Sequence, residues 1–256
     1  MRYLKTLILS LAAAVPLPVL AQTTNYNWTG FYAGAHFGYG FGQPTNPAIG
    51  FSDPYGIGVG TFLELGGFNI ANYPNKGILG GVQAGYNYQI SSWVLGAEAD
   101  WSATDINGSY SALSFIDPNT VSGISVTNVK TSLDWLATLR ARVGVTSDNW
   151  LFYGTGGLAL GRVTSGFDSY ITDRFTGFNF SYNGANSTTN VGWAAGAGTE
   201  YALGRFSVKF EYLYYDVGAN RVTSPTTDKV YALGSFLTLD QRMAGHIVRV
   251  GLNYHF

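Results

Sequence analysis

The sequence predicts an all-β fold: an eight-stranded antiparallel up-and-down transmembrane β-barrel with short periplasmic turns and long extracellular loops. Three observations predict it. Eight blocks of the chain alternate large apolar residues with small or polar ones at a period of two, and successive side chains of a strand point to opposite faces. Only 11% of the residues are charged, against roughly 25% in an ordinary soluble domain. The connections between blocks are alternately tight and long, which is typical of membrane-spanning barrels.

The start of the chain indicates export. A positively charged start precedes an apolar run over residues 6–20, which is too short to span a membrane, and Ala21 lies where a signal peptidase would cut. We therefore expect residues 1–21 to be a cleaved signal peptide and residues 22–256 to form a single barrel domain. A membrane anchor or a buried helix is the alternative, which two prolines inside the run disfavour.

The first four blocks each carry their large apolar residues on one face. Residues 28–40 alternate aromatic residues with glycine and histidine. Residues 78–90 and 93–103 continue the alternation and are separated by two serines, which predicts a hairpin. Residues 131–145 give the clearest pattern, because every second residue from Leu133 onward is apolar. All four blocks are therefore predicted to be strands.

The fifth block departs from this pattern and the last three regain it. Residues 150–163 follow a turn, but their aromatic residues and leucines choose no face, and their glycines suggest a bulge or a close neighbour. Residues 191–203 and 206–216 alternate on either side of a Gly-Arg turn. Residues 245–256 form a last strand that is apolar on one side only. We expect that strand to pair with the first, because closure of a barrel leaves no strand edge exposed.

The long connections all fall on one side of the predicted barrel. They span residues 41–77, 104–130, 164–190 and 217–244, whereas the other links are tight turns. Transmembrane barrels place short turns in the periplasm and longer loops outside the cell. The four long segments are therefore predicted to be extracellular loops.

A period of two does not by itself tell which face meets lipid. A soluble ligand-carrying barrel would show the same alternation turned inside out. However, the apolar face carries more Trp, Phe, Tyr and Leu side chains than an eight-stranded lumen can hold. The other face is mostly small, with a few charges, which suits a narrow lumen. We therefore expect the apolar face to meet lipid, with an aromatic girdle at Trp28, Phe31, Trp93, Trp101, Trp150, Phe206, Tyr214 and Tyr254.

Four motifs carry a resemblance to a known family. They are NWTGFYAGAHFGYG at 27–40, LATLRARVGV at 136–145, YGTGGLALG at 153–161 and VRVGLNYHF at 248–256. Together they resemble the small outer-membrane β-barrel proteins of α-proteobacteria, labelled porin-family or outer-membrane immunogenic proteins, and the likeness is strongest in the strands. The resemblance implies an eight-stranded barrel in the cell outer membrane. It also implies an activity that varies among members: anchoring of the envelope, weak pore formation, surface adhesion or hemin binding.

The resemblance further implies a role for the last residue. Phe256 is similar to the terminal aromatic residue that the barrel-assembly machinery reads in such proteins. The alternative is that Phe256 is one more girdle residue. Outer-membrane lipid and this machinery are the expected partners.

Charged residues on the predicted lumen face are the candidate functional residues. They are Glu98, Asp100, Asp134, Arg140, Arg142, Glu200, Lys209, Glu211 and Arg249. Buried charges need partners or water, so we expect an ion-pair network that holds the barrel rigid and closed. The alternative is a narrow ion path in which these charges set selectivity.

Other chemistry finds little support in the sequence. The three histidines lack metal-ligand spacing, so no metal and no cofactor is predicted. Hemin, if bound, would use one histidine or an exposed loop tyrosine: Tyr55, Tyr73, Tyr170 or Tyr231. Motifs of hydrolases, nucleotide-binding loops and metalloproteases are missing, which predicts a protein that is not an enzyme. A net charge of −1 gives no reason to expect nucleic acid.

The sequence thus predicts an integral outer-membrane barrel with a structural role in the envelope and at most narrow pore activity. Two alternatives stay open. One is a small-solute porin channel, and the other is a surface receptor or adhesin, hemin binding included, that acts through its extracellular loops. The sequence does not define the host or small-molecule ligand that such loops would bind.

Overall fold

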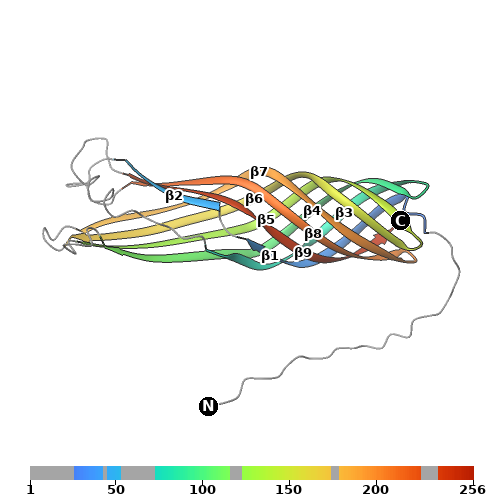
Figure 1. Ribbon diagram of the computed structural model, residues 1–256, viewed down its shortest axis with the longest axis horizontal. Helices are drawn as coiled ribbons and strands as arrows, with labels where there is room; N and C mark the ends of the chain where they lie inside the picture. The colour runs from blue at the N-terminus through green and yellow to red at the C-terminus, as the bar shows by residue number, and fades with distance from the viewer. Residues whose placement is uncertain (1–25, 43–44, 53–72, 116–122, 174–178, 226–235) are drawn as a thin grey trace, which may run out of the picture.

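The computed structural model describes residues 26–42, 45–52, 73–115, 123–173, 179–225 and 236–256. The expected signal peptide lies outside this part of the chain. The described part contains nine strands: β1 (Gly30–Gly42), β2 (Thr45–Ser52), β3 (Asn75–Ile90), β4 (Trp93–Phe115), β5 (Gly123–Ser147), β6 (Trp150–Asp173), β7 (Asn179–Leu203), β8 (Phe206–Pro225) and β9 (Phe236–His255) (Figure 1). None of the described segments is a helix long and apolar enough to cross a membrane.

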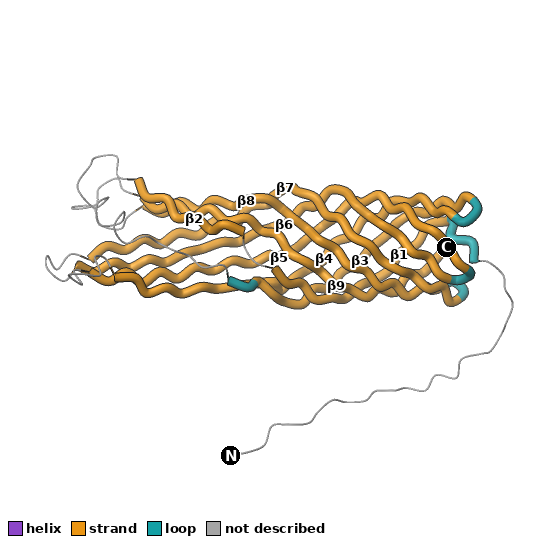
Figure 2. The backbone as a smooth tube through the Cα atoms, in the orientation of Figure 1, coloured by secondary structure: helices purple, strands orange, loops and turns teal. Residues whose placement is uncertain are grey.

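Eight of these strands close into a ring. Each pairs with the next in the order β1-β3-β4-β5-β6-β7-β8-β9, and β1 also pairs with β9 (Figure 2). Neighbours in the ring are antiparallel, and the last strand lies beside the first, with Tyr39 opposite Val248. The ninth strand, β2, resumes the chain after β1 and pairs with β9 farther along. The predicted eight-stranded up-and-down barrel, closed by its last strand, is therefore confirmed.

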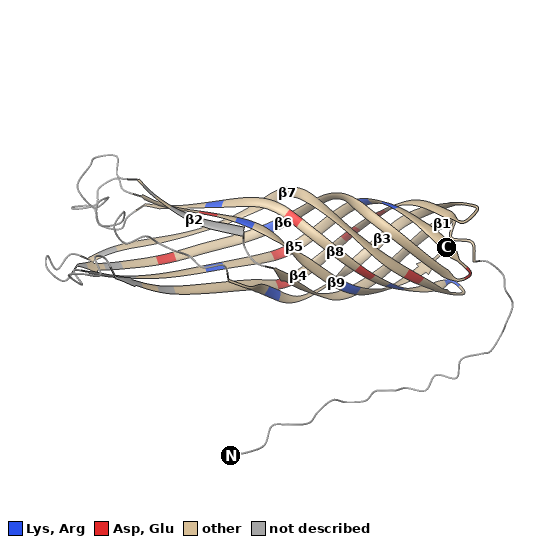
Figure 3. Cartoon of the chain, in the orientation of Figure 1, with Lys and Arg blue, Asp and Glu red and all other residues tan. Residues whose placement is uncertain are grey.

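The two faces of the wall are as the alternation predicts. Many outward side chains are large and apolar, and Phe31, for example, is 65% exposed. Inward side chains are buried, and Arg140 on the lumen face is only 1% exposed. Charged positions are sparse along the strands, as Figure 3 shows. An apolar exterior without charge is the surface that a bilayer requires, because hydrocarbon cannot solvate charged groups.

Strand β6 is more regular than its sequence suggests. It pairs with β5 residue for residue from Trp150 to Arg162, so the bulge considered for its glycines is wrong. The alternative, a close neighbour, holds at Gly157, where an added Cβ would lie 2.1 Å from the backbone oxygen of Leu139. Its inward residues include Leu151, which is fully buried. The period of two was hidden because some inward positions of this strand are themselves apolar.

The part of the wall whose outward side chains are mainly apolar is called the lipid-facing band. Bulges in three strands mark its outer limit. The register shifts between Leu133 and Trp135 in β5, between Ala103 and Ile106 in β4, and between Asp216 and Ala219 in β8. A bulge adds one residue to a strand and exchanges the faces of all residues beyond it. Leu133 consequently points inward and is fully buried, although the sequence pattern placed it on the outer face.

Most of the segments expected as extracellular loops are strand. About 9 to 11 tilted residues cross a bilayer, whereas β4 to β9 have 20 to 25 residues each. The pairing of β7 with β8 ends at Trp193 and Asp216, the level of the bulges. β3 does not extend beyond this level, because it begins at Asn75. The extensions therefore form two sheets, one from β4 to β7 and one from β8, β9 and β2, seen as two groups at the end of the barrel away from the C-terminus (Figure 1).

The two sheets enclose a core of their own, and we call this unit the projecting sandwich. Its buried apolar residues are Val129, Phe167, Tyr182, Val222 and Leu239. A hydrogen bond also joins the sheets, because the Thr131 hydroxyl donates to the side-chain oxygen of Gln241 at 2.6 Å. The described strands thus carry the fold well beyond the lipid-facing band.

Single-cysteine labelling tests the placement of this sandwich, since the chain has no cysteine of its own. Ser187 and Ala197 both face outward on β7, but Ser187 lies in the sandwich and Ala197 in the lipid-facing band. In intact cells we expect a membrane-impermeant maleimide to modify Ser187→Cys and to leave Ala197→Cys unmodified. Equal labelling of the two variants would contradict the assignment.

Candidate functional site

The lumen is filled by three layers of side chains. A periplasmic apolar layer next to the tight turns contains Trp28, Val94, Leu151, Tyr153 and Ala202. The middle layer is charged. An outer apolar layer follows on the side of the projecting sandwich and contains Leu79, Ile106, Leu133, Leu136, Ala159, Val163, Ala194, Leu213, Tyr215, Val217, Met243 and Ile247. The charged layer therefore lies between two apolar layers.

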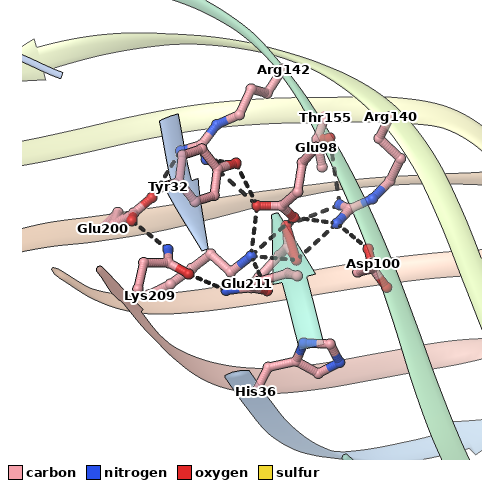
Figure 4. A network of polar contacts seen from close by, with 12 residues as sticks. Tyr32, His36, Glu98, Asp100, Arg140, Arg142, Thr155, Glu200, Lys209 and Glu211 are labelled. Carbon is pink, nitrogen blue, oxygen red and sulfur yellow. Dashed lines mark hydrogen bonds and ion pairs between the residues drawn. The ribbon is translucent and has the colours of Figure 1, made fainter. Parts of the chain in front are cut away.

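Eight of the nine charged residues expected in the lumen lie together in this middle layer, which we call the lumen network. They are Glu98, Asp100, Arg140, Arg142, Glu200, Lys209, Glu211 and Arg249. Figure 4 shows most of their side chains converging around Glu98. The set has four acids and four bases, so its formal charge is zero.

Local sequence explains why these groups meet. Acids or bases recur at every second position in three strands, as in Glu98 and Asp100, so both members of each such pair point inward. The register then places opposite charges face to face, with Glu98 opposite Arg140 and Glu211 opposite Arg249. Directly opposed pairs of opposite charge stabilise neighbouring strands.

Glu98 is the centre of the lumen network. Its carboxylate lies 2.6 Å from a guanidinium nitrogen of Arg140 and 2.9 Å from the ammonium of Lys209. It also accepts a hydrogen bond of 2.7 Å from the Tyr32 hydroxyl. Arg142 donates at 2.8 Å to the same hydroxyl. Arg142 and Arg249 each also lie 3.6 Å from the carboxylate, so four cations surround Glu98.

Glu211 and Asp100 share two arginines. Glu211 lies 2.5 Å from Arg249 and 3.0 Å from Arg140. Asp100 lies 3.1 Å from Arg249 and 2.9 Å from Arg140, and it accepts a further bond of 2.5 Å from the Thr138 hydroxyl. Each arginine therefore bridges two carboxylates, and guanidinium groups suit such planar, multiple bonding.

A second arm of the lumen network reaches toward the periplasmic layer. Arg142 donates to Glu200 at 2.9 Å, and its guanidinium carbon lies 4.1 Å above the centre of the Tyr153 ring. Glu200 also accepts hydrogen bonds from Ser207 and from the Asn253 amide. Pairing is not complete, because the Nε atom of Arg142 has no partner in the described part of the chain. The site is a dense, neutral cluster of immobilised charges.

Asp134 is the ninth residue that the sequence predicted to lie in the lumen, and this prediction was wrong. It lies on the outer surface, where its carboxylate accepts hydrogen bonds of 2.9 Å from Ser132 and 2.8 Å from Thr164. Arg162 stands 3.8 Å away. The cause is the bulge in β5, which reverses the alternation at this point.

The structure places the expected girdle residues at the outer surface with one exception. Phe31, Trp93, Trp101, Trp150 and Phe206 are exposed, and Tyr214 and Tyr254 are half-buried. Trp28 was wrongly expected there, since it is 0% exposed and belongs to the periplasmic apolar layer. It precedes β1, so strand alternation does not govern it. Phe256, at the end of the chain, is 79% exposed.

Sequence reasoning did not assign roles to several inward polar residues. Tyr32 and Gln83 both join the lumen network, and Lys209 donates at 2.6 Å to the Gln83 side chain. The alternation of the sequence could have identified them as lumen residues, because both fall on the predicted lumen face. Their hydrogen-bonding partners could not be known without the register of strands that are distant in sequence.

The described candidates for metal or hemin binding do not come together. The three histidines have separate hydrogen-bonding partners: Ser102 for His36, Tyr212 for His246 and Ser207 for His255. No cluster of metal-ligating groups occurs among the described residues. Tyr73 was expected to be exposed, but it is 3% exposed and its hydroxyl is bonded to Thr131 and Gln241. Tyr170 is exposed, and Tyr55 and Tyr231 lie outside the described residues.

A closed barrel with an apolar exterior and a buried polar interior defines the class of small membrane-spanning β-barrels. The chain belongs to the outer membrane protein beta-barrel domain family, which matches residues 7–256. It is a protein of the cell outer membrane.

Relatives share much of the chain. The 31 kDa outer-membrane immunogenic proteins of Brucella melitensis and Brucella suis are 35% identical over 244 residues, which cover 93% of this chain and 88% of theirs. A 22 kDa outer membrane protein of Rhizobium leguminosarum is 29% identical over 68% of this chain and 67% of its own. The crystal structure of Neisserial surface protein A is similar at 14% identity and a TM-score of 0.37, covering 89% of this chain and 98% of that one.

Neutralising one carboxylate tests the balance of the lumen network. Glu98→Gln keeps the shape but leaves an uncompensated buried cation, so we expect the free energy of unfolding to fall by about 3 kcal/mol or more. Urea unfolding followed by tryptophan fluorescence measures this. Asp134→Asn is the matched control, because an exposed pair contributes roughly 0 to 1 kcal/mol. Equal effects of the two substitutions would contradict the account.

Proposed function

We propose that this protein is a closed structural barrel of the outer membrane, which stabilises the envelope and carries the projecting sandwich on its outer side. The observation that supports this best is the neutral lumen network held between two apolar layers. All eight members are at most 6% exposed. A group of charges that neutralise one another inside a sealed space acts as a rigid plug.

A small-solute channel is less well supported. Conduction needs binding that is weak enough for an ion to leave, and water that is continuous along the path. Here the guanidinium groups of Arg140 and Arg249 each already lie within ion-pair distance of three carboxylates. An ion entering would have to break these bonds and also pass the outer apolar layer, where dewetting opposes its entry.

A surface receptor is the second candidate, and the projecting sandwich favours it. The outward face of β4 to β7 in this unit consists mainly of serine, threonine, asparagine and small residues, with few charges. Such a face could meet a partner while the barrel below serves as its anchor. The name immunogenic, given to the Brucella relatives, accords with an exposed outer surface.

Catalysis and cofactor binding have no support in the lumen network. Its acids and bases are held in ion pairs, so none is free to act as a general acid or base. We further propose that lipid surrounds the apolar outer face and that Phe256, exposed at the end of β9, serves as the assembly signal.

Conductance across a planar lipid bilayer tests the closed barrel. We expect neither the refolded protein nor the Arg140→Gln/Arg249→Gln double variant to give steady current steps, because the apolar layers close the lumen without help from the charges. The double variant is expected to melt at a lower temperature. Heat-modifiable gel mobility must show that both have folded. Steady, ion-selective steps whose selectivity changes in the double variant would establish a channel instead.

A further inference from the structure

The outer surface of the barrel has a groove beside the end of its first strand. β1 ends at Gly42, which pairs with Asn75, the first residue of β3. Beside this seam the outer surface is hollowed, and the residues that line the hollow include Phe41, Lys76, Tyr214 and His246. We call it the seam groove.

The seam groove lies at the outer limit of the lipid-facing band. The register sets Lys76 beside Phe41, Phe41 beside His246, and His246 beside Tyr214, in one row across four strands. The next outward row toward the periplasm consists of Ile78, Tyr39, Val248 and Tyr212, which are all apolar or aromatic and exposed. On the other side of the row, Arg242 is the next exposed charge along β9. Headgroups meet a barrel at this kind of boundary.

Aromatic rings build the apolar part of the seam groove and also fix a donor in it. The His246 ring stacks on Phe41 with centroids 5.4 Å apart and meets Tyr214 edge-on at 5.3 Å. The Tyr212 hydroxyl and Nδ1 of His246 form a hydrogen bond of 2.6 Å. Nδ1 is occupied by this bond, and Nε2 has no hydrogen-bonding partner among the described residues, so it is the ring nitrogen left to meet a ligand.

Lys76 gives the seam groove a positive charge that no described acid neutralises. Asp105 stands on the adjacent strand, but its carboxylate accepts from the Asn107 amide at 3.0 Å and forms no ion pair with Lys76. Asp216 is engaged by Arg242 at 2.5 Å. An exposed ammonium at a membrane boundary, beside an imidazole donor and an apolar floor, matches a ligand with an anionic head and a hydrocarbon tail.

We propose that the seam groove binds an anionic lipid of the outer leaflet, with Lys76 and His246 contacting the anionic headgroup. The acyl chain continues along the exposed apolar row below, so the lipid needs no separate pocket. A soluble anion fits less well, because one exposed lysine attracts an anion only weakly and a free ion gains nothing from the apolar floor of the groove. The proposal does not depend on whether the lumen conducts.

Native mass spectrometry of the full mature protein in detergent micelles tests the proposal. The probe is dioleoylphosphatidylglycerol, with zwitterionic dioleoylphosphatidylcholine as the reference lipid. We expect Lys76→Gln to weaken the apparent affinity for the anionic lipid about fivefold and to leave the reference lipid unchanged. His246→Phe keeps the ring stacking but removes the donor, and a smaller loss is expected from it. Lys130→Gln, an exposed lysine of the projecting sandwich, should have no effect.

Each other outcome would overturn the proposal. Unchanged binding in Lys76→Gln would show that the groove holds no anionic headgroup. Equal losses in Lys76→Gln and Lys130→Gln would indicate a general surface charge effect. Displacement of the lipid by inorganic phosphate at equal concentration would indicate a site for free anions. Heat-modifiable mobility confirms folding of every variant, and all three substitutions lie outside the lumen network.

Discussion

Neutrality of buried charge inside the lumen is the constraint on which the rest of this structure depends. Burying a charge costs free energy unless the charge is paired and hydrogen-bonded. Removing one member of a buried pair therefore destabilises the fold, because the remaining charge stays buried without a partner. Here four acids and four bases balance one another within one layer. Every strand of the ring supplies a member or a direct partner: Tyr32, Gln83, Glu98, Arg140, Tyr153, Glu200, Lys209 and Arg249. The lumen network therefore cross-links the barrel from within.

The apolar layers on either side follow from the same constraint. Water at either end of the lumen network would compete for its charges and weaken each pair, because ion pairs are weaker at high dielectric. Trp28 at one end and residues such as Ile106 and Leu213 at the other exclude that water. The exterior meets the opposite requirement, with apolar side chains toward lipid. Beyond the lipid-facing band there is neither a charged layer to keep dry nor lipid to contact. The strands continue there as the projecting sandwich.

The sequence predicted the barrel, its closure and eight members of the lumen network, because all three depend on a period of two that a strand cannot avoid. It failed where that period is broken or hidden. The bulge at Asp134 has no local signature, so one inserted residue reversed the assignment of that carboxylate. Leu151 and Tyr153 hid the period in β6, because parts of this lumen are apolar. Trp28 lies outside any strand.

The projecting sandwich was missed for a different reason. Its strands carry serine, threonine, asparagine and glycine, which are common in loops, and their outward faces are polar because they meet water rather than lipid. Residues such as Val129 and Phe167 were the available signal, since they recur on the inward face of their strands. The partners that bury them come from a second sheet far away in sequence, so the pattern of a single strand could not reveal it.

A double-mutant cycle between Glu211 and Arg249, whose charged atoms lie 2.5 Å apart, tests the central claim most directly. The free energy of unfolding in urea would be measured for Glu211→Gln, Arg249→Gln and the double variant. Neutrality predicts that each single variant loses stability and that the double variant loses at least about 1.5 kcal/mol less than the sum, because the buried charges again balance. Strictly additive losses would show that the two charges act independently and would contradict the account.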